Sequence, residues 1–302
     1  MCFIEKILNH RKMNKISIKS NHFFANISKT GAEILSIQNT VVNQSYFWDV
    51  DTQFWNRTSP NLFPIVGRLK NDAFQHNGQS FEMFQHGFAR NLEFEIIHLT
   101  DNSVSLKLTS DENTRKVYPF DFVLEISYIL HDNHLDVHYK ITNLSNEKMP
   151  FSVGAHPAFA LSEPLENYQL VFDQPFKASR HLIDAGLYNG HSEPMIDGDT
   201  LNLSSELIQN DAVVFKHPPF YSVTLQHKNG QKLVTVSSSD FHYWGFWSKP
   251  GAPFFCIEPW AGLADSTDAS GNLFDKEGIQ ILSPTASQSF SYSMEFHESD
   301  LK

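Results

Sequence analysis

The sequence predicts an all-β protein in which large antiparallel sheets pack face to face. Two features carry this prediction: apolar and polar residues alternate with a period of two over several stretches, and clusters of turn-forming residues separate those stretches. No stretch shows the 3.6-residue period of a long amphipathic helix. No sequence repeat of fixed length is visible, which makes a propeller the less favoured all-β architecture.

The clearest strands are expected between residues 104 and 141. Alternate positions there are apolar, so each strand is expected to bury one face and expose the other. The apolar positions are Val104, Leu106 and Leu108, then Leu124, Ile126 and Tyr128, then Leu135, Val137, Tyr139 and Ile141. Turns are expected at 131–134, 143–150 and 227–232, which contain Asn together with Asp, Gly, Ser or Pro.

Length and composition favour one large domain. The chain has 302 residues, of which 41% are hydrophobic, so it can bury a large core. No linker rich in Ser, Gly or Pro divides it. We therefore expect residues 13–302 to form a single β-sandwich domain, and residues 1–12 to be a disordered segment or an extension ahead of it.

Charge and cysteine content exclude several classes of partner. The chain carries 23 Lys and Arg against 34 Asp and Glu, a formal net charge of −11, which disfavours nucleic acids and anionic membrane surfaces. No window approaches 18 uninterrupted apolar residues, so no membrane-spanning helix is expected. The two cysteines, Cys2 and Cys256, offer no disulfide framework, which predicts a reducing, cytoplasmic setting.

One carboxylate lies inside an apolar run. Glu258 is part of the sequence FFCIEPW at 254–260. Burying an unpaired carboxylate costs several kcal/mol or forces the group to keep its proton. The simpler interpretation is an edge-strand glutamate that points to solvent, and the alternative is a functional group that needs a partner.

Two histidine segments supply candidate partners for this carboxylate. The first, FQHGFARN at 84–91, contains Gln85, His86 and Arg90, and the second, FSVGAHPAF at 151–159, contains His156. Each histidine alone could be a hydrogen-bonded structural residue. Together with a carboxylate in one cleft, they would suit general acid–base catalysis, in which one group takes a proton as another delivers one.

Other kinds of chemistry find little support in the sequence. The closest histidine pairs, His131 with His134 and His134 with His138, lie on a polar strand or its turn and are expected at the surface rather than in a metal site. No G-x-S-x-G nucleophile motif, G-x-G-x-x-G motif or phosphate-binding loop is present. We therefore expect no metal and no cofactor.

Aromatic residues are dense between 241 and 260. Core packing explains about half of these rings, but Tyr243, Trp244 and Trp247 beside a polar loop would also suit stacking against a sugar ring. Asp240 and Asp211 could then form hydrogen bonds with sugar hydroxyls. This interpretation predicts a carbohydrate site.

The order of four motifs resembles the aldose 1-epimerase, or galactose mutarotase-like, family. The motifs are GRLKN, QHGFAR, GAHPAF and IEPW, and the resemblance extends from about residue 16 to residue 296. It implies a β-supersandwich of large antiparallel sheets. It also implies that Glu258 is the catalytic base and His156 the catalytic acid, and that His86 and Asp211 bind the sugar.

Two further motifs bear on the substrate. Arg68 and Asn71 fall where better-known mutarotases have GRxxNR, but the final arginine of that motif is replaced here by Asp72. Gln85 and Arg90 resemble the hexose-6-phosphate 1-epimerases, in which the arginine helps to hold the phosphate. A carboxylate near the site would repel a phosphate dianion, so a neutral aldohexose is favoured and a phosphorylated hexose is the alternative.

The expected activity is interconversion of α and β anomers of an aldohexose by ring opening and reclosure. The expected partner is a small-molecule sugar, and the expected state is a monomer or weak homodimer. A carbohydrate-binding protein without catalysis would share the cleft and its aromatic residues. A lyase or hydrolase subunit on the same scaffold is a further alternative, since a fold does not determine a function.

Overall fold

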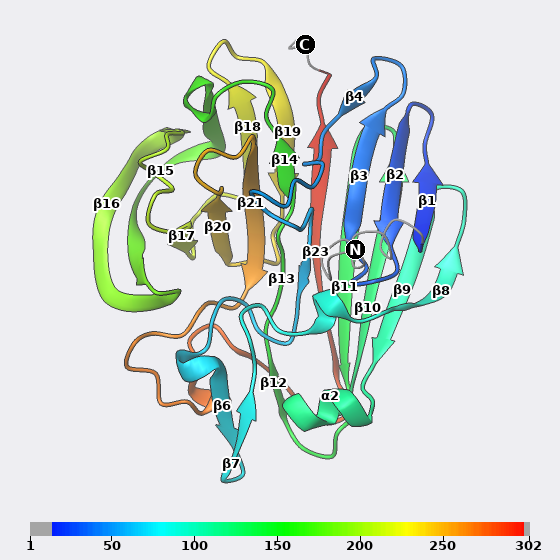
Figure 1. Ribbon diagram of the computed structural model, residues 1–302, viewed down its shortest axis with the longest axis vertical. Helices are drawn as coiled ribbons and strands as arrows, with labels where there is room; N and C mark the ends of the chain where they lie inside the picture. The colour runs from blue at the N-terminus through cyan, green and yellow to red at the C-terminus, as the bar shows by residue number, and fades with distance from the viewer. Residues whose placement is uncertain (1–13, 299–302) are drawn as a thin grey trace.

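The computed structural model describes residues 14–298, which fold into antiparallel β-sheets with little helix (Figure 1). The all-β prediction is confirmed. Residues 1–12, expected to be an extension, lie outside the described residues. Within the described part of the chain, no helix is long and apolar enough to cross a membrane. The helical elements are α2 (Glu112–Val117) and the 3₁₀ turns η1 (Lys70–Asp72), η2 (Ala89–Asn91), η3 (Leu165–Asn167) and η4 (Leu273–Asp275).

A nine-stranded sheet is the largest sheet among the described residues. Its neighbouring strands are all antiparallel. In spatial order the strands are β16 (Leu187–Asn202), β15 (Tyr168–Asp184), β18 (Ser222–His227), β19 (Lys232–Ser237), β23 (Ser287–Phe296), β11 (His134–Asn143), β10 (Phe122–His131), β9 (Ser103–Thr109) and β8 (Glu95–Leu99).

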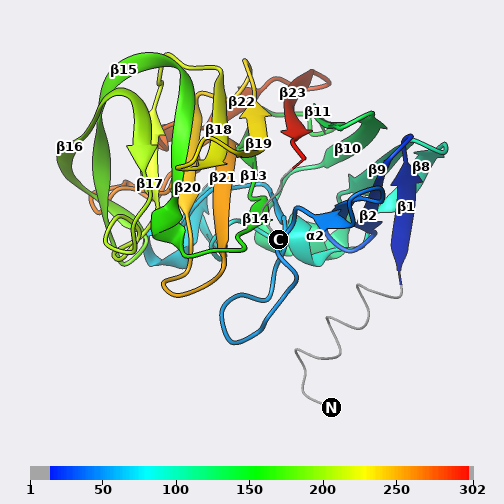
Figure 2. The ribbon, with the colours of Figure 1, turned by 90° about the horizontal axis from the view of Figure 1, so that it is seen from above.

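Two smaller sheets cover this large sheet (Figure 2). One consists of β1 (Lys15–Lys19), β2 (Phe23–Ser28), β3 (Ile34–Asn39) and β4 (Gln44–Ser45). The other has the order β17 (Val213–Lys216), β20 (Tyr243–Trp247), β21 (Phe254–Ala261), β13 (Val153–Ala155) and β5 (Asn61–Leu62), with β14 (Ala158–Ala160) also paired to β21. Two-stranded ladders join β12 (Met149–Phe151) to β22 (Gln280–Leu282) and β6 (Ala73–His76) to β7 (Gln79–Glu82).

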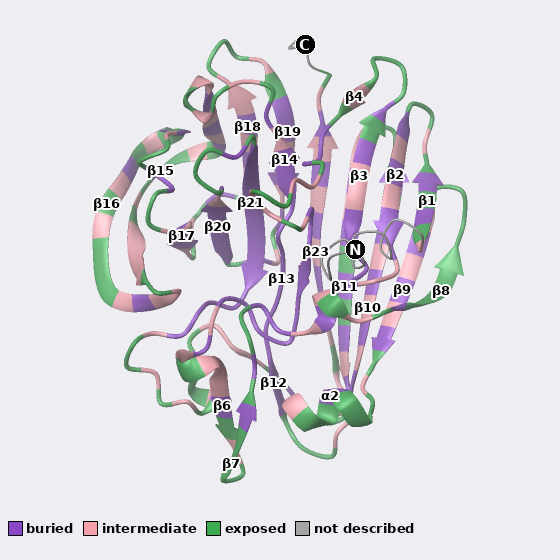
Figure 3. Ribbon diagram, viewed as in Figure 1, coloured by how far each residue is buried: buried purple, intermediate pink, exposed green. Residues whose placement is uncertain are grey.

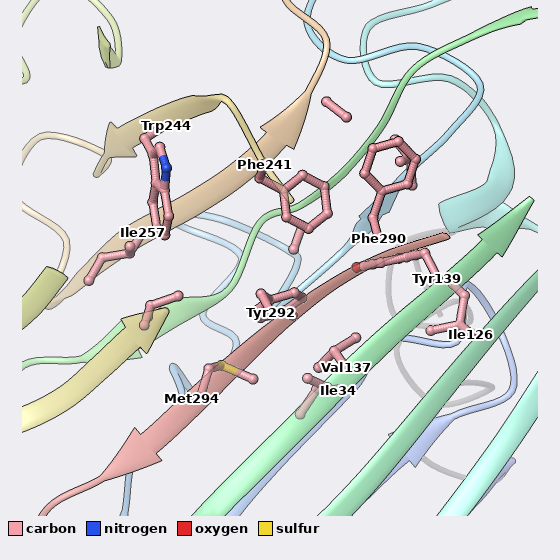
Figure 4. Packing of buried hydrophobic residues seen from close by; sticks show 14 of the residues in the cluster. Ile34, Ile126, Val137, Tyr139, Phe241, Trp244, Ile257, Phe290, Tyr292 and Met294 are labelled. Atoms are coloured by element: carbon pink, nitrogen blue, oxygen red, sulfur yellow. The ribbon is translucent and has the colours of Figure 1, made fainter. Parts of the chain in front are cut away.

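The main hydrophobic core lies between the sheets, as the alternating sequence pattern predicts. Every apolar position predicted to face inward between residues 104 and 141 is buried. In Figure 4, Trp244 and Ile257 of the six-stranded sheet and Tyr292 and Met294 of β23 belong to one packed cluster. The predicted turn at 131–134 is a hairpin in which Asp132 adopts a positive φ of 48°.

A long hairpin made of β15 and β16 arches away from the sandwich (Figure 1). Register shifts interrupt its ladder at three points, and such bulges bend paired strands. Just beyond its tip the hairpin joins the loop that follows β21, because Tyr188 N–H donates to Asp265 O at 2.9 Å and Thr267 N–H donates to Tyr188 O at 2.8 Å. This hairpin was not predicted from the sequence, and it forms one wall of the cleft described below.

A buried polar residue ties the sheets together. Asn61, at the start of β5, is 3% exposed. Its Nδ2 donates to the carbonyl oxygens of Gly31 and Ala32 at 2.9 and 3.0 Å, and its Oδ1 accepts from the Tyr139 hydroxyl at 2.6 Å. Without Asn61 the Gly31 carbonyl and the Tyr139 hydroxyl would lose these partners in the core, so the network fixes β5 against β11.

Replacing Asn61 with leucine (Asn61→Leu) is expected to lower the free energy of unfolding by roughly 2–4 kcal/mol, because buried polar groups lose their partners. Asn26→Leu is the control, since Asn26 lies on the half-buried outer face of β2. The control is expected to change stability by less than about 1 kcal/mol. Urea unfolding compares the two, and equal losses would contradict the role given to Asn61.

Candidate active site

The carboxylate of Glu258, predicted to be functional, lies on a strand that is covered on both faces. All eight residues of β21 are buried, as its continuous purple colour shows in Figure 3, and Glu258 is 1% exposed. Phe255 and Ile257 face the main core, whereas Phe254 and Cys256 belong to a separate cluster on the other face. The interpretation of Glu258 as a solvent-facing edge residue is therefore wrong, because β21 pairs with strands on both sides.

Strand register brings His156 opposite Glu258. β13 and β14 both pair with β21, with Gly154 opposite Trp260 before the histidine and Ala158 opposite Cys256 after it. The register is the same on both sides, so the short break around His156 lies across from Glu258. His156 Nε2 is 3.2 Å from Glu258 Oε2.

A second histidine is held by the backbone of a neighbouring loop. His86 and Gly87 adopt positive φ values of 67° and 69°. His86 N–H donates to Gly67 O at 2.9 Å, and Gly67 N–H donates to His86 Nδ1 at 3.2 Å. Because Nδ1 accepts a hydrogen bond, the ring is neutral with its proton on Nε2. The His86 and His156 ring centroids lie 5.6 Å apart with the rings nearly perpendicular.

These residues line a cleft of about 520 Å³. Six predicted site residues meet there although 173 positions separate the first from the last in the sequence. They are Gln85, His86, Arg90, His156, Asp211 and Glu258. Trp247, one of the three aromatic residues expected to stack on a sugar, also lines the cleft.

Four other predicted residues do not line the cleft, and for them the expectation is corrected. Tyr243 is buried in a smaller apolar cluster with Leu62 and Val214. Trp244 is 1% exposed and packs against Phe220 in the main core, because its side chain leaves the opposite face of β20. The Asp240 carboxylate accepts hydrogen bonds from the Ser291 backbone N–H and hydroxyl at 2.8 and 2.7 Å. Asn71 is exposed in the turn η1 with a φ of 61°.

Arg68 is also absent from the cleft lining, and its guanidinium is already occupied. Its Nε and Nη2 donate to the two carboxylate oxygens of Asp72 at 2.8 and 2.7 Å, and Nη1 donates to Ala185 O at 3.0 Å. Asp72, the residue that departs from the family motif, therefore binds the Arg68 guanidinium through both of its carboxylate oxygens. Arg68 supports the tip of the β15–β16 hairpin instead of contacting a ligand in the cleft.

Aromatic rings that the sequence reasoning missed enclose His156. The ring centroid of Trp55, from the loop 51–57, lies 4.9 Å from that of His156, with an angle of 31° between the ring planes. The ring centroid of Trp247 lies 5.6 Å from that of His156, and these two rings are nearly perpendicular. Tyr188 and Trp260 also line the cleft and were not predicted. For Trp55 no signal beyond its aromatic character was present, because its place depends on a loop with no repeating pattern.

Burial controls the protonation of the central pair. The pKa of Glu258 lies well above its usual range, because the side chain is removed from water and the nearby charge of Asp211 adds to the effect. Burial lowers the pKa of His156 to about 3, and the charge of Arg90 acts in the same direction. Both shifts favour the uncharged form of each group, so a proton shared by the pair is held on Glu258 rather than on His156.

Buried polar atoms without hydrogen-bond partners collect at this cleft. Among the described residues they include His156 Nδ1, Tyr188 Oη, Glu258 Oε2 and Trp260 Nε1, all from residues of the cleft wall. The short contact between His156 and Glu258 does not have hydrogen-bond geometry. Native proteins leave few such groups unsatisfied, and a cluster of them points to a polar ligand.

The same region contains donor atoms that are able to approach a metal ion. His156, Cys256 and Glu258 each offer one such atom, and these atoms lie within 4.8 Å of one another. Cys256 is fully buried, and desolvation raises the pKa of its thiol well above the usual range, whereas metal ligation needs the thiolate. A metal ion bound here would therefore have to displace the thiol proton of Cys256.

Residues 14–278 match the family model described as aldose 1-epimerase, and the chain belongs to that family. An isomerase that acts on a small-molecule sugar is thereby supported at the level of the family.

Individual relatives agree with this assignment over nearly their full lengths. The chain is 29% identical to protein LacX (plasmid) of Lactococcus lactis subsp. lactis, over 92% of this chain and 98% of that protein. It is 32% identical, with a TM-score of 0.89, to a galactose mutarotase related enzyme from Lactobacillus acidophilus, covering 94% of this chain and 97% of that one. A galactose mutarotase-like protein from Lactobacillus casei gives the same identity and TM-score and is covered completely.

Removing the buried carboxylate is expected to stabilise the protein in a pH-dependent way. The pKa of Glu258 is higher in the folded state than its ordinary value of 4.5, so the native protein loses stability as the pH rises above 4.5 toward the folded pKa. Glu258→Gln escapes this loss. Its free energy of unfolding is expected to exceed that of the native protein by roughly 1–2 kcal/mol at pH 8 and to match it at pH 4.5. Urea unfolding at both pH values measures this difference, and a gap that widens on acidification would refute the protonation assigned here.

Proposed function

We propose that this protein is an aldose 1-epimerase that interconverts the α and β anomers of an aldohexose by acid–base ring opening and reclosure. The observation that carries the proposal is the contact of 3.2 Å between His156 Nε2 and Glu258 Oε2 in a cleft lined by further polar groups. His86, through Nε2–H, and Asp211 supply a donor and an acceptor for sugar hydroxyls.

The reaction moves one proton at each of two oxygens that are bonded to the same carbon. The C1 hydroxyl loses its proton to the base, the C1–O5 bond breaks, and O5 receives a proton from the acid. C1 becomes an aldehyde, rotation about C1–C2 exchanges its faces, and the reverse steps close the ring to the other anomer. Because both oxygens are attached to C1, the acid and the base need to lie only a few ångströms apart.

Glu258 acts as the base and His156 as the acid in this proposal. In the free cleft the opposed pKa shifts favour a proton on Glu258 over one on His156. In this proposal that proton passes to His156 when the substrate hydroxyls replace the apolar surroundings of the carboxylate. The number of protons on the pair is unchanged by this transfer. The same pair can then serve both directions of the reaction, as an equilibrium between anomers requires.

Polarimetry of freshly dissolved α-glucose and α-galactose tests the activity. The native protein is expected to accelerate equilibration, and Glu258→Gln and His156→Asn are each expected to lose roughly 10²–10⁴-fold, the usual contribution of a placed acid or base. Glu82→Gln and His98→Asn are matched controls at exposed positions on β7 and β8, and we expect them to keep full activity. Binding of sugar with equilibration at the buffer rate would favour a carbohydrate-binding protein instead.

The charge of the cleft decides between a neutral and a phosphorylated sugar. Arg90 and Lys249 both line the cleft, which favours a phosphorylated hexose as the second candidate. Three observations oppose a phosphorylated substrate. The Arg68 guanidinium is bound by Asp72, and Nη2 of Arg90 donates to Gln85 O at 2.6 Å. Asp211 also places a carboxylate in the cleft lining. We therefore propose a neutral aldohexose.

Exchange NMR on glucose and glucose 6-phosphate compares the two substrates. We expect kcat/KM for glucose to equal or exceed that for glucose 6-phosphate, because the cleft keeps no uncommitted pair of guanidinium groups for a dianion. Arg90→Ala and Lys249→Ala are expected to change the ratio of the two values by less than about tenfold. A large preference for the phosphorylated sugar that either variant removes would show that the substrate carries a phosphate.

A further inference from the structure

We propose that Trp260 is a positioning residue for Glu258, and that its indole N–H donates a hydrogen bond to the Glu258 carboxylate while that group is charged. Its kinetic consequence rests on the proposed function. The two residues are two positions apart on β21, so their side chains leave the same face of the strand, and both line the cleft.

The indole is seated where two glycines leave room for it. Gly154 on β13 and Gly245 on β20 belong to the strands on either side of β21. A Cβ atom at Gly154 would lie 2.6 Å from Cδ1 of Trp260, and a Cβ atom at Gly245 would lie 2.4 Å from its Cη2. Neither glycine has a positive φ, so the backbone conformation does not call for glycine at either position. The absence of a side chain at these two glycines instead leaves the space that the Trp260 ring occupies.

Packing alone does not explain a tryptophan at this position. Trp260 is 6% exposed, and its Nε1 is buried without a hydrogen-bond partner. Such a donor costs free energy that a purely apolar ring would avoid. Glu258, two positions away on the same face of β21, has an Oε2 atom that is likewise buried without a hydrogen-bond partner. The donor and the acceptor therefore match each other in the charged state of the carboxylate.

The indole suits this task because it cannot lose its proton during the reaction. His156, the other donor in contact with Glu258, has to give and take protons in the proposed mechanism. An indole N–H only donates, so it holds the carboxylate in one orientation whenever that group is charged. In the free protein Nε1 does not meet full hydrogen-bond geometry, but Trp260 lies near enough to lower the pKa of Glu258 as a donor, although burial raises that pKa by more.

Replacing Trp260 with 3-benzothienylalanine tests the hydrogen bond, because this residue has the shape of tryptophan with sulfur in place of N–H. The first measurement is the ¹³C titration of the Glu258 carboxyl in the protein without sugar, assigned with Glu258→Gln. Its pKa is expected to rise by about one unit, a tenfold loss of the ionised form at a given pH. The second measurement is the anomerisation of glucose, in which kcat is expected to fall about tenfold with little change in KM.

The same replacement at Trp244 is the control. Trp244 lies on the adjacent strand with its ring in the main core, so it is expected to leave both measurements unchanged. Trp260→Phe provides a second variant without the N–H that ordinary expression can supply, and the same rise in the Glu258 pKa is expected.

Each failure has a distinct meaning. An unchanged Glu258 titration in both Trp260 variants would overturn the proposal. A raised KM with an unchanged titration and kcat would also overturn it, since the indole would then bind the sugar directly. If the native protein does not accelerate anomerisation, the proposed function fails, but the carboxyl titration still decides the role of Trp260.

Discussion

The architecture depends on keeping one carboxylate dry beside one imidazole. Glu258 lies on a central strand whose faces are both covered, and the shared register of β13 and β14 along that strand sets His156 against it. One face of this strand packs against the large sheet through the main core, and loops from distant parts of the sequence line the cleft around the pair. Burial gives the two groups the opposed pKa shifts that allow one proton to be shared between them.

This arrangement costs stability where it supports chemistry. Three features lower the free energy of unfolding. They are a buried carboxyl group, an imidazole kept neutral among aromatic rings, and a group of buried polar atoms without hydrogen-bond partners. The extensive hydrophobic core between the sheets offsets that cost. Trp55 and Trp247 have a double effect, because they exclude water from His156 and also complete the apolar cluster beneath Phe254. The cleft is thus built as a local exception in a well-packed protein.

The sequence predicted the sheets well wherever one strand face is exposed, because alternation then reveals which residues point inward. The same logic fails for β20 and β21, which are buried on both faces and show no alternation. Trp244 and Trp247 could not be separated for this reason, and only the structure shows that the second alone faces the cleft. The order of the motifs did predict that His86, His156 and Glu258 share one cleft. Arg68 was misplaced because its partner Asp72 departs from the family motif, and Trp55 was missed because a loop contact leaves no periodic signal.

The most direct test of the account is the protonation state of His156 in the protein without sugar. ¹⁵N NMR of the histidine side chains, with the His156 signals assigned by their loss in His156→Asn, reports whether the ring is neutral or charged. The account predicts neutral imidazole shifts at pH 7, with protonation only at pH values well below those of ordinary histidines, since burial lowers the pKa of His156 to about 3. Imidazolium shifts at pH 7 would mean that the pair rests as an ion pair, and would contradict the claim that burial places the shared proton on Glu258.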